Sequence, residues 1–223
     1  MTRTCLKDRK LPRYTKGEEI FNMVTHIVGG GIGVITLALC IMEAFAKNSH
    51  VALVCGVIFG VSMISLYAIS SIYHGLHEGT AKKVFQVIDH CTIYFLIAGT
   101  YTPMLLCSLI KTNKIAAFVT FAVVWGLTAL AVTLNAIDLK KYKVFSMICY
   151  IGIGWAIIFS IKDMFEALTP VGFWLLLSGG IVYTAGTIFY KAGQNKKYLH
   201  SVFHIFVVVG SILHALSVIF FAI

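Results

Sequence analysis

The sequence has few charged residues for its length. Asp, Glu, Lys and Arg make up 12% of its 223 residues, whereas about a quarter of an ordinary soluble domain is charged. Apolar residues make up 59% of the chain, and the mean hydropathy is +0.89. This composition excludes a water-soluble globular protein and indicates a chain embedded in a membrane.

Acidic residues and paired cysteines are also scarce. Nine acidic residues stand against 18 basic ones, which gives a net charge of +9. The basic residues fall in the gaps between apolar runs, so they indicate membrane topology and not a nucleic-acid partner. The cysteines show no paired spacing and lie mostly within apolar runs, which predicts no disulfide framework. They are Cys5, Cys40, Cys55, Cys91, Cys107 and Cys149.

Long apolar runs fill most of the chain. Seven of them are bounded by charged residues, and each is close to or above the length of about 20 residues that a helix needs to cross a bilayer. They lie near residues 20–46, 51–74, 85–109, 115–137, 144–165, 170–191 and 198–222. The sequence therefore predicts an all-α integral membrane protein. A seven-transmembrane helix bundle at residues 18–223 follows a basic tail at residues 1–17. Pro103 predicts a kink in the third span, where Thr100 and Thr102 are suited to satisfy freed backbone groups.

The basic residues are distributed unequally between the two ends of the predicted bundle. With the amino terminus in the cytosol, fourteen of them face inward and four face outward. The outward ones are Lys47, Lys111, Lys114 and Lys162. Because cytoplasmic loops carry the excess of Lys and Arg, this asymmetry predicts a cytosolic amino terminus and an extracytoplasmic carboxyl terminus.

Polar residues of four predicted helices fall at one depth. At about 1.5 Å of rise per residue, they all lie within roughly 10 Å of the predicted cytosolic face. They come from the first, second, third and seventh helices, and they are Glu19, Asn22, His26, Ser70, His74, Asp89, His90, His200 and His204. Ionisable groups at membrane depth usually face the protein interior and carry function.

Three histidines of this layer are candidate metal ligands. His200 and His204 stand four residues apart, so they project from one face of their helix. Such a pair can bind one metal ion, and His74 would complete the three-nitrogen set that leaves a zinc position open for water. The pair alone is weak evidence, because two histidines at this spacing can also simply hydrogen-bond to neighbouring helices.

Two further residues of the layer have a candidate role in catalysis. Asp89 follows His74 across a short turn and could orient a metal-bound water, or it could pair with Lys82 or Lys83. Ser70 lies one helical turn from His74 and could hold the same water, or it could donate only to its own helix.

The remaining polar residues have two alternative roles each. Glu19, Asn22 and His26 form one stripe, which could orient the ligating imidazoles from outside the ligand set or make ordinary interfacial contacts at a helix start. His77 and Glu78 are rival ligands in the turn, although solvation is the more usual state of loop residues. The sequence favours packing or a hydrogen bond for His90.

Four motifs in this order resemble the hemolysin III family. They are E-x-x-N-x-x-x-H at residues 19–26, S-x-x-x-H at 70–74 followed by Asp89, A-G-T-Y-T-P at 98–103, and H-x-x-x-H at 200–204. This family is the bacterial branch of the progestin and adiponectin receptor superfamily. The resemblance runs from about residue 16 to the end of the chain and implies a multi-pass protein of the bacterial cytoplasmic membrane.

The resemblance also implies a site and a chemistry. Zinc (Zn²⁺) would lie near the inner face on His74, His200 and His204, with Asp89 and Ser70 near the zinc-bound water. Kinship with alkaline ceramidases suggests hydrolysis of an amide bond in a lipid. The family name refers to lysis of red cells, but seven packed helices with a basic tail do not resemble a secreted pore former.

These observations lead to two main hypotheses. The first is a zinc-dependent hydrolase that cleaves an amide or acyl bond of a membrane lipid at the inner leaflet. The second is a regulator or sensor of the membrane state, without enzymatic activity, in which zinc is structural. A transporter or pore is disfavoured, because the ionisable residues lie on one side of the bilayer and do not form a path through it.

Overall fold

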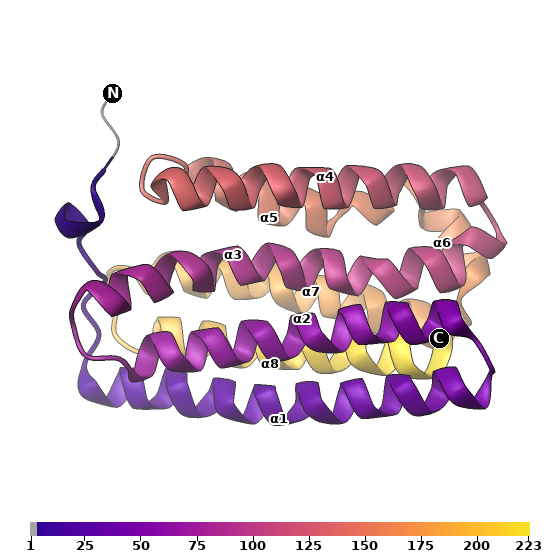
Figure 1. The fold of residues 1–223 in the computed structure, drawn as a ribbon, viewed down its shortest axis with the longest axis horizontal. Coiled ribbons are helices and arrows are strands. Elements are labelled where there is room, and N and C mark those ends of the chain that lie inside the picture. Colours follow the sequence, from indigo (N-terminus) through magenta and orange to yellow (C-terminus); the bar gives the residue numbers. More distant parts are fainter. Residues whose placement is uncertain (1–3) are drawn as a thin grey trace.

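The computed structural model describes residues 4–223, and all regular secondary structure in this range is helical (Figure 1). The α-helices run side by side along the long axis of the molecule. Their bounds are α1 Lys16–Ala46, α2 His50–Gly75, α3 Thr80–Pro103, α4 Lys114–Asp138, α5 Lys143–Gly154, α6 Ile161–Ala167, α7 Pro170–Ala192 and α8 Leu199–Ser217. Short 3-10 or π segments extend or link them: η1 Leu6–Asp8, η2 Met104–Ser108, η3 Leu109–Lys111, η4 Ala156–Ser160 and η5 Val218–Ala222.

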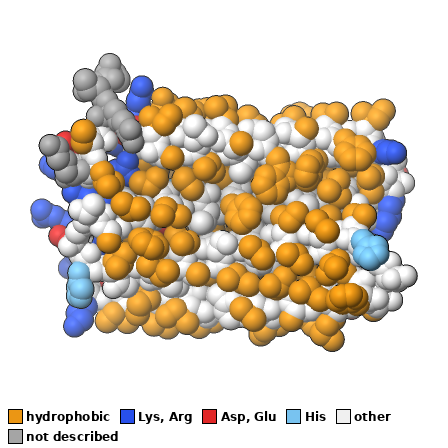
Figure 2. Space-filling view, in the orientation of Figure 1, with side chains coloured by type: hydrophobic (Ala, Val, Ile, Leu, Met, Phe, Trp, Pro, Cys, Tyr) orange, Lys and Arg blue, Asp and Glu red, His pale blue; other side chains and the backbone are white. Residues whose placement is uncertain are grey.

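The described residues form seven rods that are long and apolar enough to cross a membrane, which confirms the seven predicted spans. The third rod is α3 with η2 and η3, the fifth is α5 with η4 and α6, and the seventh is α8 with η5. Hydrophobic side chains cover the middle of the bundle, and Lys and Arg gather at its ends (Figure 2). This distribution is the one that a lipid-embedded bundle requires.

One end of the bundle carries the amino-terminal tail and the loops at residues 76–79, 139–142 and 193–198. We name it the basic end, and it is the one predicted to face the cytosol. The predicted tail begins at residues 1–3, which lie outside the described residues. The division at residue 18 and the orientation in the membrane stay predictions.

The capping residues explain where several helices begin. At the start of α1, the Thr15 hydroxyl accepts from the Glu18 N–H (3.3 Å), and the Glu18 carboxylate accepts from the Thr15 N–H (2.8 Å). This reciprocal pair satisfies two backbone donors that a helix start leaves without partners. Ser49 and Asn113 cap α2 and α4, and in each case one side-chain oxygen accepts from a backbone N–H of the first turn.

Two rods depart from regular α-helix. Directly after Pro103 the third rod changes from α to π form, while Thr100 and Thr102 donate to carbonyls four residues earlier in the helix (both 2.8 Å). The fifth rod breaks at Trp155, which the sequence did not predict. There the Tyr101 hydroxyl of α3 donates to the Gly154 carbonyl (2.9 Å), so a neighbouring helix supplies a hydrogen-bond partner for the backbone at the break.

Close helix contacts depend on glycine at a few positions. A side chain at Gly29 would place its Cβ 2.5 Å from the Tyr67 ring, and one at Gly60 would lie 2.6 Å from Leu37. Both contacts join α1 to α2. Small residues therefore let these two backbones approach, as is typical of membrane helices.

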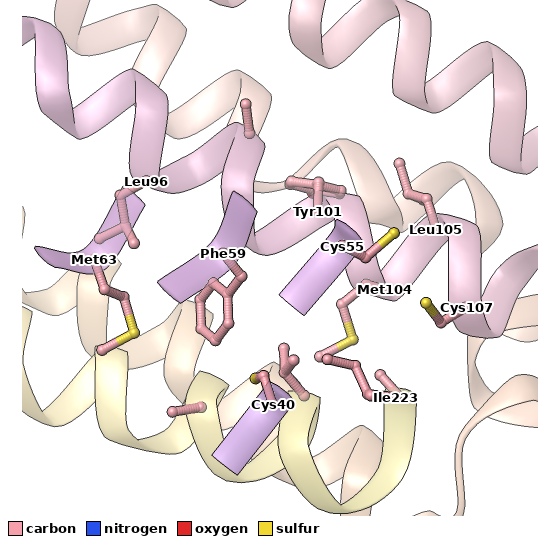
Figure 3. Packing of buried hydrophobic residues seen from close by; sticks show 14 of the residues in the cluster. Cys40, Cys55, Phe59, Met63, Leu96, Tyr101, Met104, Leu105, Cys107 and Ile223 are labelled. Carbon is pink, nitrogen blue, oxygen red and sulfur yellow. The ribbon is translucent and has the colours of Figure 1, made fainter. Parts of the chain in front are cut away.

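The apolar core lies mainly between α1, α2, the third rod and the end of the seventh. Figure 3 shows part of it, with Cys40, Phe59, Met63, Met104 and Ile223 converging from these elements. Sulfur-containing side chains are frequent in this cluster and fill irregular gaps between helices. The core fixes α1, α2 and α8 relative to one another, and polar residues gather where these three helices reach the basic end.

Candidate metal centre

Three histidines converge at the basic end of the bundle. His74 lies in the last turn of α2, and His200 and His204 lie one turn apart at the start of α8. One ring nitrogen of each lies within 4.8 Å of those of the other two. All three side chains are buried, with exposed fractions of 3%, 9% and 2%. Among the described residues, no other group of three His, Cys, Asp or Glu side chains has this arrangement.

The orientation of His74 is set by a carboxylate from α1. Its Nδ1 lies 2.6 Å from Glu19 Oε2, so Nδ1 carries the proton and donates. Its Nε2 is buried and has no hydrogen-bond partner among the described residues. An imidazole that donates through one nitrogen to a carboxylate presents a lone pair on the other, which is the usual state of a metal-ligating histidine. The donor set therefore fits a metal ion.

Glu19 also binds a lysine. Its Oε1 accepts from the Lys82 ammonium (2.7 Å), which donates in addition to the Leu76 carbonyl (2.9 Å). The alternative that Asp89 pairs with Lys82 is therefore not supported, because this ammonium bridges Glu19 and the α2–α3 turn. Glu19 links α1, α2 and α3 at the site.

His200 and His204 contact each other, one helical turn apart on α8. Their Nε2 atoms lie 3.2 Å apart. Two imidazole nitrogens at this separation can share one proton or direct two lone pairs at one cation. Since zinc lies about 2.0–2.1 Å from each imidazole nitrogen, two ligands of one ion can stand this close together.

Asp89 and Ser70 are neighbours in the structure. The Ser70 side chain is buried, and its hydroxyl interacts with the Asp89 carboxylate, which also lies within electrostatic range of His74. The predicted pair from α2 and α3 is therefore brought together near His74. A carboxylate at this position can accept a proton from a water molecule in the site.

His26 and Asn22 are buried against the site, although their contacts differ in kind from those of Glu19. The His26 ring stacks on the His204 ring, with centroids 3.8 Å apart and planes at 26°. Asn22 is fully buried, and within the described residues the side-chain nitrogen and oxygen atoms of Asn22 and His26 have no hydrogen-bond partners. Of the predicted stripe, Glu19 therefore orients a candidate ligand by a hydrogen bond, and His26 contacts another by ring stacking.

Three further histidines do not belong to the three-histidine cluster. His77 lies exposed in the α2–α3 loop beside Glu78, also exposed. His90 Nδ1 lies 2.8 Å from the Gln86 carbonyl oxygen, in agreement with the predicted hydrogen bond. His214 lies in the last turn of α8, where its Nε2 is 3.0 Å from the Leu176 carbonyl oxygen.

Tyr14 is a residue of the site that the sequence did not reveal. Its ring stacks on His200, with centroids 4.9 Å apart and planes at 19°, and lies 5.8 Å from the His74 ring. Burial raises the pKa of the Tyr14 phenol above its usual range. Tyr14 belongs to the basic tail and precedes the first helix, so no helical spacing connects it to the histidines.

An apolar cavity of about 190 Å³ lies next to the candidate metal centre. Residues of α3, α5, α7 and α8 line it, including His90, Tyr190 and Phe203 at the end near the site. The Phe203 ring packs against both His200 (5.6 Å) and His204 (5.9 Å). Phe203 therefore lies both in the lining of the cavity and against two of the candidate ligands.

Fold and site together define a multi-pass helical membrane protein with a buried three-histidine cluster near one end. The family model for haemolysin-III related proteins matches residues 14–215, and the chain belongs to this family. It is 35% identical to Hemolysin-3 of Bacillus cereus over 215 residues, which cover 96% of each chain. It is also 35% identical to the Hemolysin-3 homolog of Bacillus subtilis (strain 168), over 94% of this chain and 97% of the relative.

A more distant relative supports the wider superfamily. Monocyte to macrophage differentiation factor of Homo sapiens is 25% identical over 162 residues, which cover 70% of this chain and 66% of the relative. The link to the progestin and adiponectin receptor superfamily is thereby confirmed.

Proposed function

We propose that the protein is a zinc-dependent hydrolase that cleaves an amide or acyl bond of a membrane lipid at the inner leaflet of a bacterial cytoplasmic membrane. The observation that carries the proposal is the contact between Glu19 and His74. It leaves the buried Nε2 of His74 without a partner, on a residue that forms one cluster with His200 and His204.

The residues around the cluster suit hydrolysis. When bound, zinc supplies Lewis-acid polarisation of a carbonyl and makes water more acidic. His74, His200 and His204 would hold the ion and leave one position for water or substrate. Asp89 would accept a proton from the attacking water, and Ser70 would hold the Asp89 carboxylate in place.

The cavity supports a lipid as the substrate. Its lining is mostly apolar, and it ends at Phe203, which touches two of the candidate ligands. An acyl chain in the cavity would place the linkage to its head group near the histidines. The site also lies at the end of the bundle, the depth at which lipid head groups meet the hydrocarbon core.

A lipid-hydrolysis assay tests this proposal. The purified, zinc-loaded protein would be placed in liposomes that contain a ceramide as lipid amide and a bacterial glycerophospholipid as acyl ester. We expect fatty acid release that Asp89→Asn reduces by about 100-fold or more. Glu78→Gln, which changes an exposed carboxylate of the nearby loop, is expected to retain full activity. No release from either lipid by the wild-type protein, or equal release by Asp89→Asn, would count against the hydrolase.

One observation favours a second candidate function, a regulator of the membrane state with structural zinc. His74 belongs to α2, whereas His200 and His204 belong to α8, and both helices pack against α1. An ion on all three histidines would tie α2 directly to α8. If this is its role, chelation lowers the thermal stability of the protein in detergent, and no lipid is cleaved under any condition.

A further inference from the structure

Residues 4–15 of the amino-terminal tail cross the basic end of the bundle (Figure 1). At its start, the Thr4 N–H donates to Asp138 Oδ2 at the end of α4 (2.8 Å). The turn η1 then packs against α3, and Arg9 is buried. The tail ends at the capping box of α1. Residues 4–15 therefore form a strap that is attached at both ends.

A second contact fixes the carboxyl end of this strap. Glu18 Oε1 accepts from the Tyr198 N–H (2.6 Å) in the loop before α8. Tyr14 lies four residues before Glu18, and its position over His200 follows from this attachment of α1 to the α7–α8 loop. Its ring is nearly parallel to the His200 imidazole, at 19°.

Aromatic rings surround the candidate ligands, and one of these rings does not belong to a transmembrane helix. Tyr73 packs against His74 (4.7 Å), Phe203 against His200 and His204, and His26 against His204. These rings belong to transmembrane helices. Among the ring contacts of the described residues, the Tyr14 ring is the one that the strap supplies to the cluster.

We propose that residues 4–15 are a lid over the metal centre, in which Tyr14 covers His200 and His74 and limits exchange of the ion with the cytosol. This inference rests on the metal site of the proposed function. The helices hold the other rings in place, whereas Tyr14 can leave when the Thr4–Asp138 contact, the packing of η1 on α3 and the ring stack break. Opening of the strap exposes the site without unfolding a transmembrane helix.

Metal release measures the lid directly. Zinc-loaded protein in detergent would be mixed with an excess of a chromogenic chelator, and the rate of zinc transfer would be followed. We expect release about tenfold faster from Tyr14→Ala, since loss of an aromatic stack is worth roughly that factor. Tyr14→Phe keeps the ring and is expected to release zinc at the wild-type rate.

Two further variants separate the lid from general loosening of the fold. Tyr142→Ala removes a tyrosine at the same end of the bundle, whose ring contacts Lys141 and none of the histidines, and is expected to leave the rate unchanged. Asp138→Asn weakens the attachment at Thr4 without touching the site. Like Tyr14→Ala, it is expected to accelerate zinc release. It serves as the test variant if Tyr14→Ala does not fold.

A second measurement does not depend on metal. Diethyl pyrocarbonate modifies accessible imidazoles, and peptide mass spectrometry would follow its reaction with His200 in chelator-treated protein. Faster modification in Tyr14→Ala or Asp138→Asn than in the wild type supports the lid. Equal modification, or equal zinc release from the wild type and both variants, overturns it. If the wild type binds no zinc, the metal proposal fails, and the modification rates alone decide on the lid.

Discussion

Glu19 Oε2 and His74 Nδ1 lie 2.6 Å apart across the interface between α1 and α2. The same carboxylate binds the Lys82 ammonium through its other oxygen, so three helices meet at one side chain. This contact decides which nitrogen of His74 carries the proton and which keeps its lone pair. The proposed metal centre therefore depends on a residue that is not itself a ligand.

Substitution of Glu19 tests that dependence. We expect Glu19→Gln to weaken zinc affinity by about 10- to 100-fold, because loss of a carboxylate partner lowers the basicity of the ligating imidazole and loosens its orientation. Competition with a chelator of known affinity measures the effect. Glu78→Gln is the matched control, and an unchanged affinity in Glu19→Gln would show that the contact does not serve a metal.

His26 is expected to support the site without binding the ion. His26→Phe keeps a ring on His204 and removes two buried nitrogens that have no hydrogen-bond partner among the described residues. We therefore expect unchanged zinc content and a thermal stability equal to or above that of the wild type. His26→Ala leaves a cavity and is expected to destabilise the protein by roughly 1–3 kcal/mol. Loss of zinc in His26→Phe would identify His26 as a ligand.

Two neighbouring glycines of α1 make a matched pair for packing. Gly29→Ala places a methyl group 2.5 Å from the Tyr67 ring, whereas a methyl group at Gly31 meets nothing within 4 Å. We expect Gly29→Ala to destabilise the bundle by about 1–3 kcal/mol through overpacking. Gly31→Ala is expected to leave the melting temperature in detergent nearly unchanged. Equal melting temperatures would show that α1 and α2 separate easily.

Chelation is expected to lower the stability of the wild-type protein. A ligand that binds only the folded state stabilises it, and zinc at 100 times its dissociation constant contributes about 2.7 kcal/mol. Removal of zinc should therefore lower the melting temperature of the wild type. His204→Ala lacks a ligand, so we expect its melting temperature to be lower and insensitive to the chelator. The same response to chelator in both proteins would place the stabilising metal elsewhere.

The sequence predicted the transmembrane architecture well for a physical reason. A bilayer demands about 20 consecutive apolar residues per span, and this requirement is visible without knowledge of tertiary contacts. Depth along each helix also brought His74, Asp89 and the α8 histidines to one level. Spacing of four residues then placed His200 and His204 on one face.

The missed features depend on contacts between distant segments. Tyr14 reaches His200 because the strap is fixed by Asp138 and by the Glu18–Tyr198 contact, and neither contact leaves a periodic pattern in the sequence. At the break near Trp155, a backbone carbonyl accepts a hydrogen bond from a hydroxyl of another helix. Such positions cannot be read from hydrophobicity.

Metal content is the most direct test of the proposed centre. Elemental analysis would compare the purified wild-type protein, His200→Ala and His77→Ala, the last of which changes an exposed histidine in the adjacent loop. The three-histidine site predicts about one zinc ion per chain in the wild type and in His77→Ala, and little or none in His200→Ala. A wild-type protein without metal, or a His200→Ala protein that retains it in full, would contradict the site.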